Sequence, residues 1–278
     1  MSLTTPGRTL GQEPEDDLAY SDDLPAGGPG ARPPAARRRR RLLGYLVMPV
    51  LLGLVCACLY AWLQSKQLDS IEQRLVNFDK IWDAVVEHIK LAAVSTFFVI
   101  LLAVPLGILL TRPFAKRVTP LVIGLANIGQ MVPSIGVLVL LALIWTIGFL
   151  PAVVALVAYS VLPVLRNTMV GLQQVDRSVI EAGRGMGMTR LRVLTHIELP
   201  LAVPVILAGV RTALVINVGA ATLATFVNAG GLGDIISGGL STSRDTVIIT
   251  GAVLTAVLAL LIDWMGGIVE DLLRPKGL

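Results

Sequence analysis

The chain has 278 residues, of which 54% are hydrophobic and 15% are charged, and its mean hydropathy is +0.76. This apolar surplus is too large for one water-soluble core, so the composition predicts an integral membrane protein. The net charge of +4 does not indicate a nucleic-acid partner, because the arginines concentrate at the ends of apolar segments, where they orient membrane proteins. Cys56 and Cys58 are the only cysteines, too few for a disulfide framework or a zinc site.

Residues 1–41 are predicted to form a disordered cytoplasmic tail, because they hold prolines, glycines and an acidic run, and end in five arginines. Residues 42–63 are a first transmembrane helix, long enough to span and longer than the apolar core of a signal peptide. A lipoprotein-like cleavage box at residues 55–58 is a weak alternative, since cleavage there would destroy the span. The arginines place the amino terminus in the cytoplasm.

Residues 64–88 have apolar side chains at intervals of three and four, which predicts an amphipathic helix. Because this segment follows an outward crossing, we expect it on the extracytoplasmic surface, packed on the bundle or lying in the headgroups. His88 stands alone at a span boundary. We interpret it as an interface anchor rather than a metal ligand.

Residues 89–110 form the second predicted span, and residues 118–147 form an unusually long third one. Pro133 removes a backbone donor there, so a kink or break near the middle of the membrane is expected. Asn127, Gln130 and Ser134 cluster around the break. Polar side chains at this depth either bridge helices or line a water-filled path.

Three further spans are predicted at residues 152–170, 201–226 and 246–269, with a glycine-rich outer loop at residues 228–239. The fifth span contains Arg211 and Asn217, and the sixth contains Asp263. Arg211 and Asp263 lie at similar depths, so they either form an intramembrane ion pair or each face water near the inner surface. The assignment is an all-α membrane protein with six spans and both termini inside.

Residues 173–200 form a polar segment between two predicted apolar spans. Asp176 can cap a short helix, Gly187 suits a left-handed residue that closes it, and Thr189 can cap a second short helix, which Pro200 limits. These features predict a helix-turn-helix elbow, here called the coupling elbow. A basic loop anchored to lipid headgroups is the alternative.

The coupling elbow resembles the cytoplasmic coupling motif of permease subunits in binding-protein-dependent ABC importers, E-A-A-x3-G-x9-I-x-L-P. Gly183 replaces the second alanine, and the matching positions are Glu181, Ala182, Gly187, Ile197, Leu199 and Pro200. The resemblance covers about residues 85–275. It implies a MetI-like core of five helices within residues 89–278, preceded by the N-terminal helix, in the bacterial plasma membrane.

The resemblance also implies three protein partners: an ABC ATPase subunit, an extracytoplasmic substrate-binding protein, and a second permease subunit, identical or different. The chain has no phosphate-binding loop and no nucleophile with a base and orienting group. It is therefore predicted to be no enzyme and to hold no cofactor or metal, with ATP and magnesium bound by the partner ATPase.

Four segments, at residues 127–134, 162–168, 185–188 and 230–234, resemble the osmoprotectant branch of these importers. That branch imports quaternary amines such as glycine betaine, choline or carnitine. The polar residues near Pro133 and in the fifth span are a candidate translocation path, at Asn127, Gln130, Pro133, Ser134 and Asn217. The outer loop resembles the outer gate loop of these permeases, with candidate residues Gly230, Gly231, Gly233 and Asp234.

Other functions stay open at this point. An importer for an amino acid or an ergothioneine-like solute fits the same motifs. An ion-coupled secondary transporter is disfavoured, because such proteins usually carry several intramembrane carboxylates and only Asp263 lies plainly inside a span. A non-transporting membrane anchor gives no reason for the polar cluster near Pro133 or for the coupling elbow.

Overall fold

The computed structural model describes residues 34–273, with residues 34–44 as backbone only, and the chain divides into two units, residues 1–44 and 45–278. Most of the predicted disordered tail lies outside the described residues. Its last part does not: residues 34–41 already belong to helix α1, Pro34–Gln64. The prediction of disorder was wrong there, because arginine is a good helix former and this run continues directly into the apolar span.

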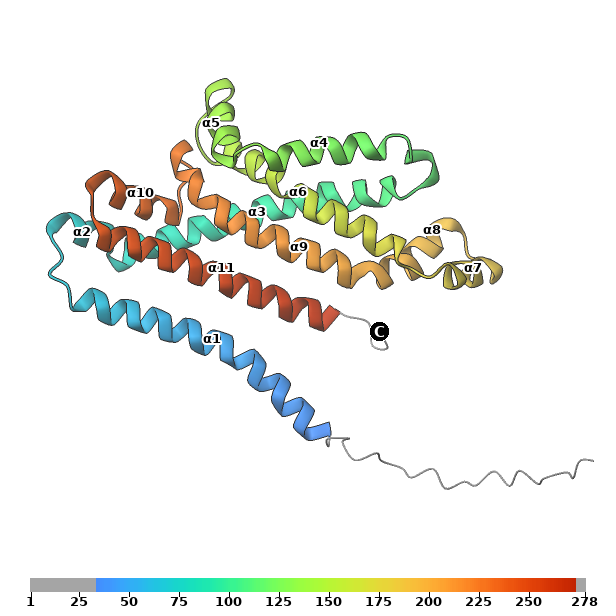
Figure 1. Cartoon of the computed structure of the whole chain (residues 1–278), viewed down its shortest axis with the longest axis horizontal. Helices are drawn as coiled ribbons and strands as arrows, with labels where there is room; N and C mark the ends of the chain where they lie inside the picture. The colour runs from blue at the N-terminus through green and yellow to red at the C-terminus, as the bar shows by residue number, and fades with distance from the viewer. Residues whose placement is uncertain (1–33, 274–278) are drawn as a thin grey trace, which may run out of the picture. The chain divides into compact units, whose positions relative to one another are not determined.

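The described part of the chain is helical (Figure 1). After α1, the α-helices are α2 Ser70–Leu75, α3 Phe78–Leu110, α4 Thr119–Met131, α5 Ser134–Ile144, α6 Phe149–Gln173, α7 Arg177–Gly185, α8 Arg190–Val193, α9 Leu199–Ala221, α10 Leu232–Thr242 and α11 Asp245–Leu273. Short 3-10 turns, Pro113–Ala115 and Thr222–Val227, and a π turn, Leu194–Glu198, complete the chain.

Within the described residues, five helical stretches are long and apolar enough to cross a membrane, and α4 with α5 makes a sixth if the bent pair is one span. With the pair counted as one span, the number equals the six predicted spans. The pair is bent by 94°, which confirms the break expected at Pro133 in the third predicted span (Figure 1). Val132 and Pro133 are extended between them, as expected for a proline and the residue before it.

Residues 64–88 do not form the single amphipathic helix that the apolar spacing predicts. Asp69 caps α2 by accepting hydrogen bonds from the amides of Ile71 and Glu72, and Asn77 caps α3 by accepting one from Lys80. The second cap starts a new helix before the first can continue, so the stretch is a short helix followed by the first turns of α3.

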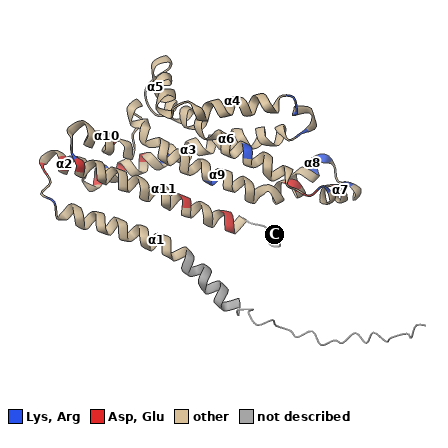
Figure 2. Cartoon of the chain, in the orientation of Figure 1, with Lys and Arg blue, Asp and Glu red and all other residues tan. Residues whose placement is uncertain are grey.

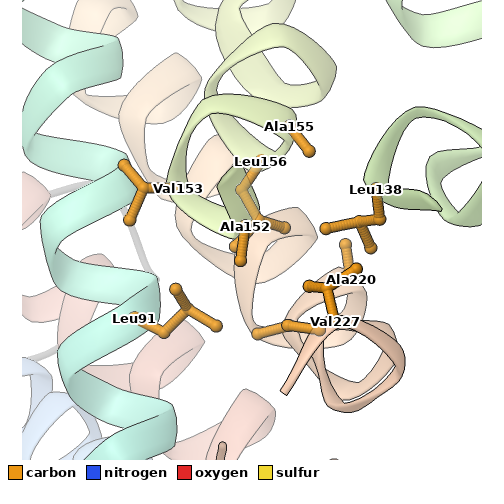
Figure 3. Packing of buried hydrophobic residues seen from close by; sticks show 10 residues of the cluster. Leu91, Leu138, Ala152, Val153, Ala155, Leu156, Ala220 and Val227 are labelled. Atoms are coloured by element: carbon orange, nitrogen blue, oxygen red, sulfur yellow. The ribbon is translucent and has the colours of Figure 1, made fainter. Parts of the chain in front are cut away.

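Helices α3, α6 and α9 pack together at the centre of the second unit. One apolar cluster brings together side chains from α3, α5, α6, α9 and the 3-10 turn that follows α9, including Leu91, Leu138, Leu156 and Val227 (Figure 3). Gly107 of α3 lies so close to Thr168 of α6 that an added Cβ would be 2.7 Å from the threonine Cβ. Such small residues let membrane helices approach closely.

Candidate functional site

The coupling elbow begins with α7, and both local signals predicted for it are present. The Asp176 carboxylate accepts a hydrogen bond from the Ser178 amide at 2.8 Å, which holds the pKa of Asp176 below its usual value by stabilising the ionised form. At the other end Gly187 has φ +84°, and the amides of Gly187 and Met188 donate to the carbonyls of Arg184 and Gly183. This pair of bonds is a Schellman motif, which ends α7 at a left-handed glycine.

The second half of the elbow differs from the prediction. Thr189 caps α8 by accepting from the Arg192 amide at 3.3 Å, as expected, but Pro200 does not end the helix. The chain runs from α8 through the π turn directly into α9, with Pro200 in the first turn of α9. The wider π turn bonds the Leu199 amide to the Leu194 carbonyl, and a proline in a first turn needs no amide partner.

The residues of the coupling motif divide into an exposed and a packed group. Glu181 and Ala182 are exposed on α7, whereas Gly183 is buried beneath them. An added Cβ at Gly183 would be 2.6 Å from the Cδ1 atom of Ile197, so these two motif positions pack against each other. Leu199 is half-buried and Pro200 exposed at the start of α9.

An ion pair with a buried carboxylate attaches the elbow to α3, and it was not predicted from the sequence. Glu198, the last residue of the π turn, is only 5% exposed, and its Oε2 atom accepts from Arg112 Nη2 at 2.6 Å. Arg112 follows the end of α3 and also donates to the carbonyl of Ile108. A single acidic residue between Ile197 and Leu199 was the available signal. Arg112 stands just after the second predicted span, where an arginine is expected to orient the protein.

The candidate path residues are not all brought together. Asn127 on α4 accepts a hydrogen bond from Arg166 on α6 at 2.8 Å, while Gln130 and Ser134 are half-buried on either side of the exposed Pro133. Asn217 is fully buried on α9, and its amide nitrogen donates to Thr96 of α3 at 2.9 Å. Its position therefore matches the alternative of a helix-bridging residue.

Arg211 of α9 and Asp263 of α11 do meet. Arg211 Nε and Nη2 each donate to a different Asp263 oxygen at 2.6 Å, and Glu270 lies 3.6 Å from the same guanidinium. The Arg211 and Asp263 side chains are 35% and 37% exposed, so the pair lies at the helix surface rather than in the core. An exposed pair of this kind typically contributes about 0.2 to 1 kcal/mol.

The glycine loop, defined here as residues 228–234, is held by the first part of α3. Gly230 and Gly231 have φ values of +81° and +101°, and the Gly231 amide donates to Glu87 Oε2 at 3.1 Å. The Leu232 amide donates to His88 Nδ1 at 3.2 Å. Because that nitrogen accepts, the proton lies on Nε2, which donates to the Val218 carbonyl at 2.8 Å.

The structure corrects two predictions in this region. His88 is fully buried and bonds α9 and the glycine loop, so it is not an interface anchor. Gly233 and Asp234 lie in the first turn of α10, not in an open loop. The left-handed Gly231 starts that helix, and Asp234, which suits a helix amino terminus, accepts a hydrogen bond from Thr225 at 2.5 Å.

Sequence and structure comparisons both find relatives of this chain. The model of the family described as "Binding-protein-dependent transport system inner membrane component" matches residues 103–275. The choline transport system permease protein OpuBB of Bacillus subtilis is 43% identical over 192 residues, which are 69% of this chain and 88% of that protein. The osmoprotectant import permease protein OsmY of Salmonella typhimurium is 38% identical over 82% of this chain and 94% of its own length.

Among solved structures, a chain of the MetNI methionine ABC transporter in an inward-facing conformation superposes with a TM-score of 0.64. It is 28% identical, and the match covers 72% of this chain and 100% of that one. The similarity is evidence about architecture as well as ancestry.

Proposed function

Because this chain belongs to the family of binding-protein-dependent transport system inner membrane components, we propose that it moves a small quaternary-amine osmoprotectant, such as glycine betaine, choline or carnitine, into the cytoplasm. The chain is a permease subunit of an ABC importer and is not itself catalytic. The observation that carries the substrate class is the 43% identity to a choline permease over 192 residues. ATP hydrolysis belongs to a separate ATPase subunit, and the solute arrives on a binding protein.

The coupling elbow is the proposed docking site for the ATPase. Its support is that Glu181 and Ala182 are exposed on a helix whose two ends are fixed, by the Asp176 cap and by the turn at Gly187. Glu181 would meet a basic group of the ATPase, and Gly183, Ile197, Leu199 and Pro200 would hold the elbow in shape. The glycine loop at Gly230, Gly231, Gly233 and Asp234 is the proposed outer gate.

The translocation path is proposed to pass the break between α4 and α5, near Asn127, Gln130, Pro133 and Ser134. A bend of 94° leaves backbone groups without helical partners, and polar side chains beside it are suited to a hydrated route. A second permease subunit, identical or different, would complete this path. Asn217 is better explained as a bridge to Thr96.

We propose six spans with both termini in the cytoplasm, and segment boundaries as predicted except where the structure differs. Lys and Arg gather at the connection between α3 and α4 and around α7 and α8 (Figure 2). This distribution fits cytoplasmic loops. Residues 64–77 and the glycine loop would then face outward.

The topology is tested with matched serine-to-cysteine variants after Cys56 and Cys58 are replaced by serine. Ser70 and Ser178 are both exposed. In intact cells, Ser70→Cys is expected to react with a membrane-impermeant maleimide, and Ser178→Cys is expected to react only after the membrane is opened. The reverse pattern contradicts the topology.

The function is tested on the complex purified through a tag on this chain. We expect an ATPase subunit to copurify and a binding protein to restore solute-dependent ATP hydrolysis. Choline, betaine and carnitine should raise the melting temperature of that binding protein, by the equivalent of about 2.7 kcal/mol at one hundred times Kd. An amino acid that stabilises it while quaternary amines do not would favour the amino-acid alternative, which the similarity to a methionine transporter supports.

A further inference from the structure

Helix α3 is attached to both candidate moving parts of the permease. Near its beginning, Glu87 and His88 accept hydrogen bonds from Gly231 and Leu232 of the glycine loop. Beyond its end, Arg112 forms an ion pair with the buried Glu198 of the coupling elbow. We call these the loop contact and the elbow contact. Residues 87 and 112 are 25 positions apart, which is about 37 Å at about 1.5 Å per residue.

The elbow contact is directional, and its carboxylate is buried. Glu198 is 5% exposed and faces the guanidinium with both oxygens, at 2.6 Å and 3.5 Å. A buried carboxylate without its partner is strongly disfavoured, so the elbow cannot move away from α3 while Glu198 stays charged and buried. The π turn that ends at Glu198 is a feature often found at functional positions in helices.

The loop contact is similarly close. A Cβ on Gly230 would lie 2.4 Å from Glu87 Oε2, and a Cβ on Gly231 would lie 3.0 Å from His88 Nδ1. His88 also donates to the Val218 carbonyl, so one buried imidazole joins α3, α9 and the glycine loop. Between the two contacts, α3 is a continuous helix packed on α6 and α9.

We propose that α3 transmits displacement of the coupling elbow to the glycine loop, with Arg112, Glu198, Glu87 and His88 as positioning residues for gating. The proposal rests on the proposed function, in which the elbow receives the ATPase and the glycine loop is the outer gate. α9 also connects the two regions along the chain. The distinctive consequence is that α9 alone does not suffice: breaking either contact of α3 uncouples the loop from the nucleotide state.

The test uses the complete complex in nanodiscs, with Cys56 and Cys58 replaced by serine and a single reporter, Ser241→Cys, at an exposed position of α10. The reaction rate with a maleimide is measured without nucleotide and with ATP plus vanadate. The starting protein is expected to show a rate ratio of at least about fivefold, the lower end of ordinary allosteric coupling. Glu198→Gln and Glu87→Ala should each bring the ratio close to one.

The double variant should be no worse than either single variant, because both interrupt one connection. Arg112→Glu combined with Glu198→Arg should restore part of the ratio. Asp83→Asn removes an exposed carboxylate of the same helix outside both contacts and should leave the ratio unchanged. Should Glu198→Gln fail to assemble, Arg112→Lys replaces it, since lysine keeps the charge but loses the forked geometry.

Two results separate the proposals. If the complex assembles and transports, yet Glu198→Gln and Glu87→Ala both retain the nucleotide-dependent ratio, transmission through α3 is wrong and α9 carries the movement. If the starting protein neither binds an ATPase nor responds to nucleotide, the proposed function itself fails. A purely stabilising role for the ion pair would lower the melting temperature while keeping the ratio, and that result also overturns the inference.

Discussion

Gly233→Ala is expected to abolish solute uptake and to lower the melting temperature of the purified complex. An added Cβ at this buried position would lie 2.1 Å from the Thr222 carbonyl oxygen and 2.9 Å from its carbon. Both atoms are backbone, so no side-chain rotation can relieve the overlap. Either α10 or the 3-10 turn Thr222–Val227 must shift, and overpacking of this kind costs about 1 to 3 kcal/mol or more.

The loss should affect the glycine loop first, because Gly233 sits between its anchors. The Leu232 amide, one residue earlier, bonds to His88, and Asp234, one residue later, bonds to Thr225. A shift of α10 by the width of a methyl group stretches both bonds. We therefore expect lost uptake even in the fraction of protein that remains folded.

Gly219→Ala is the matched control. Gly219 is exposed on α9, and an added Cβ there meets nothing within 4 Å. Alanine should be neutral or stabilising by up to about 1 kcal/mol, because it is the better helix former. Melting curves followed by fluorescence-detected gel filtration compare the two. Equal melting temperatures and normal uptake for Gly233→Ala would contradict the close packing of α10 on Thr222.

Local sequence signals predicted the caps and the turn of the elbow well and the glycine loop poorly. The Asp176 cap, the left-handed Gly187 and the Thr189 cap each depend on residues within a few positions of one another. α10 was missed because four of its first eight residues are glycine or serine and its start depends on Gly231 held against α3. No local pattern reports a contact between residues 144 positions apart.

The same distinction explains the contacts of Glu198 and His88. Arg112 and Glu198 are 86 positions apart, and either alone looks like an ordinary loop charge. The pairing of Arg211 with Asp263 was accessible from sequence because both are charges inside apolar spans, where few partners exist. The π turn was unforeseen, since a proline in its usual role predicts a helix boundary at Pro200.

Gly187→Val is expected to leave the permease inserted and bound to its partners but to abolish stimulation of the ATPase by loaded binding protein. Gly187 has φ +84°, a conformation that costs a residue with a side chain about 1 to 2 kcal/mol, and a β-branched one more. Nothing lies within 4 Å of an added Cβ, so the penalty comes from the backbone alone. The turn would relax and change the orientation of α7, which carries Glu181.

A backbone penalty of this size reduces the population of elbows with the native orientation of α7 by about 5- to 30-fold. Gly185→Val tests the specificity, because Gly185 is two residues earlier, also has open space around it, and has no positive φ. It should keep most of the stimulation. Glu181→Ala should show a milder loss, since it removes one exposed charge and leaves the turn intact.

Reconstituted complex, assayed for ATP hydrolysis with and without loaded binding protein, distinguishes the possibilities. Loss of both the basal hydrolysis and its stimulation would mean that the ATPase no longer docks, so the elbow is a binding surface. Loss of stimulation alone would mean that it docks but is not driven, which is the expected result. Normal stimulation in Gly187→Val would contradict coupling through residues 173–200, because a strained turn between α7 and α8 cannot leave a transmitting elbow unaffected.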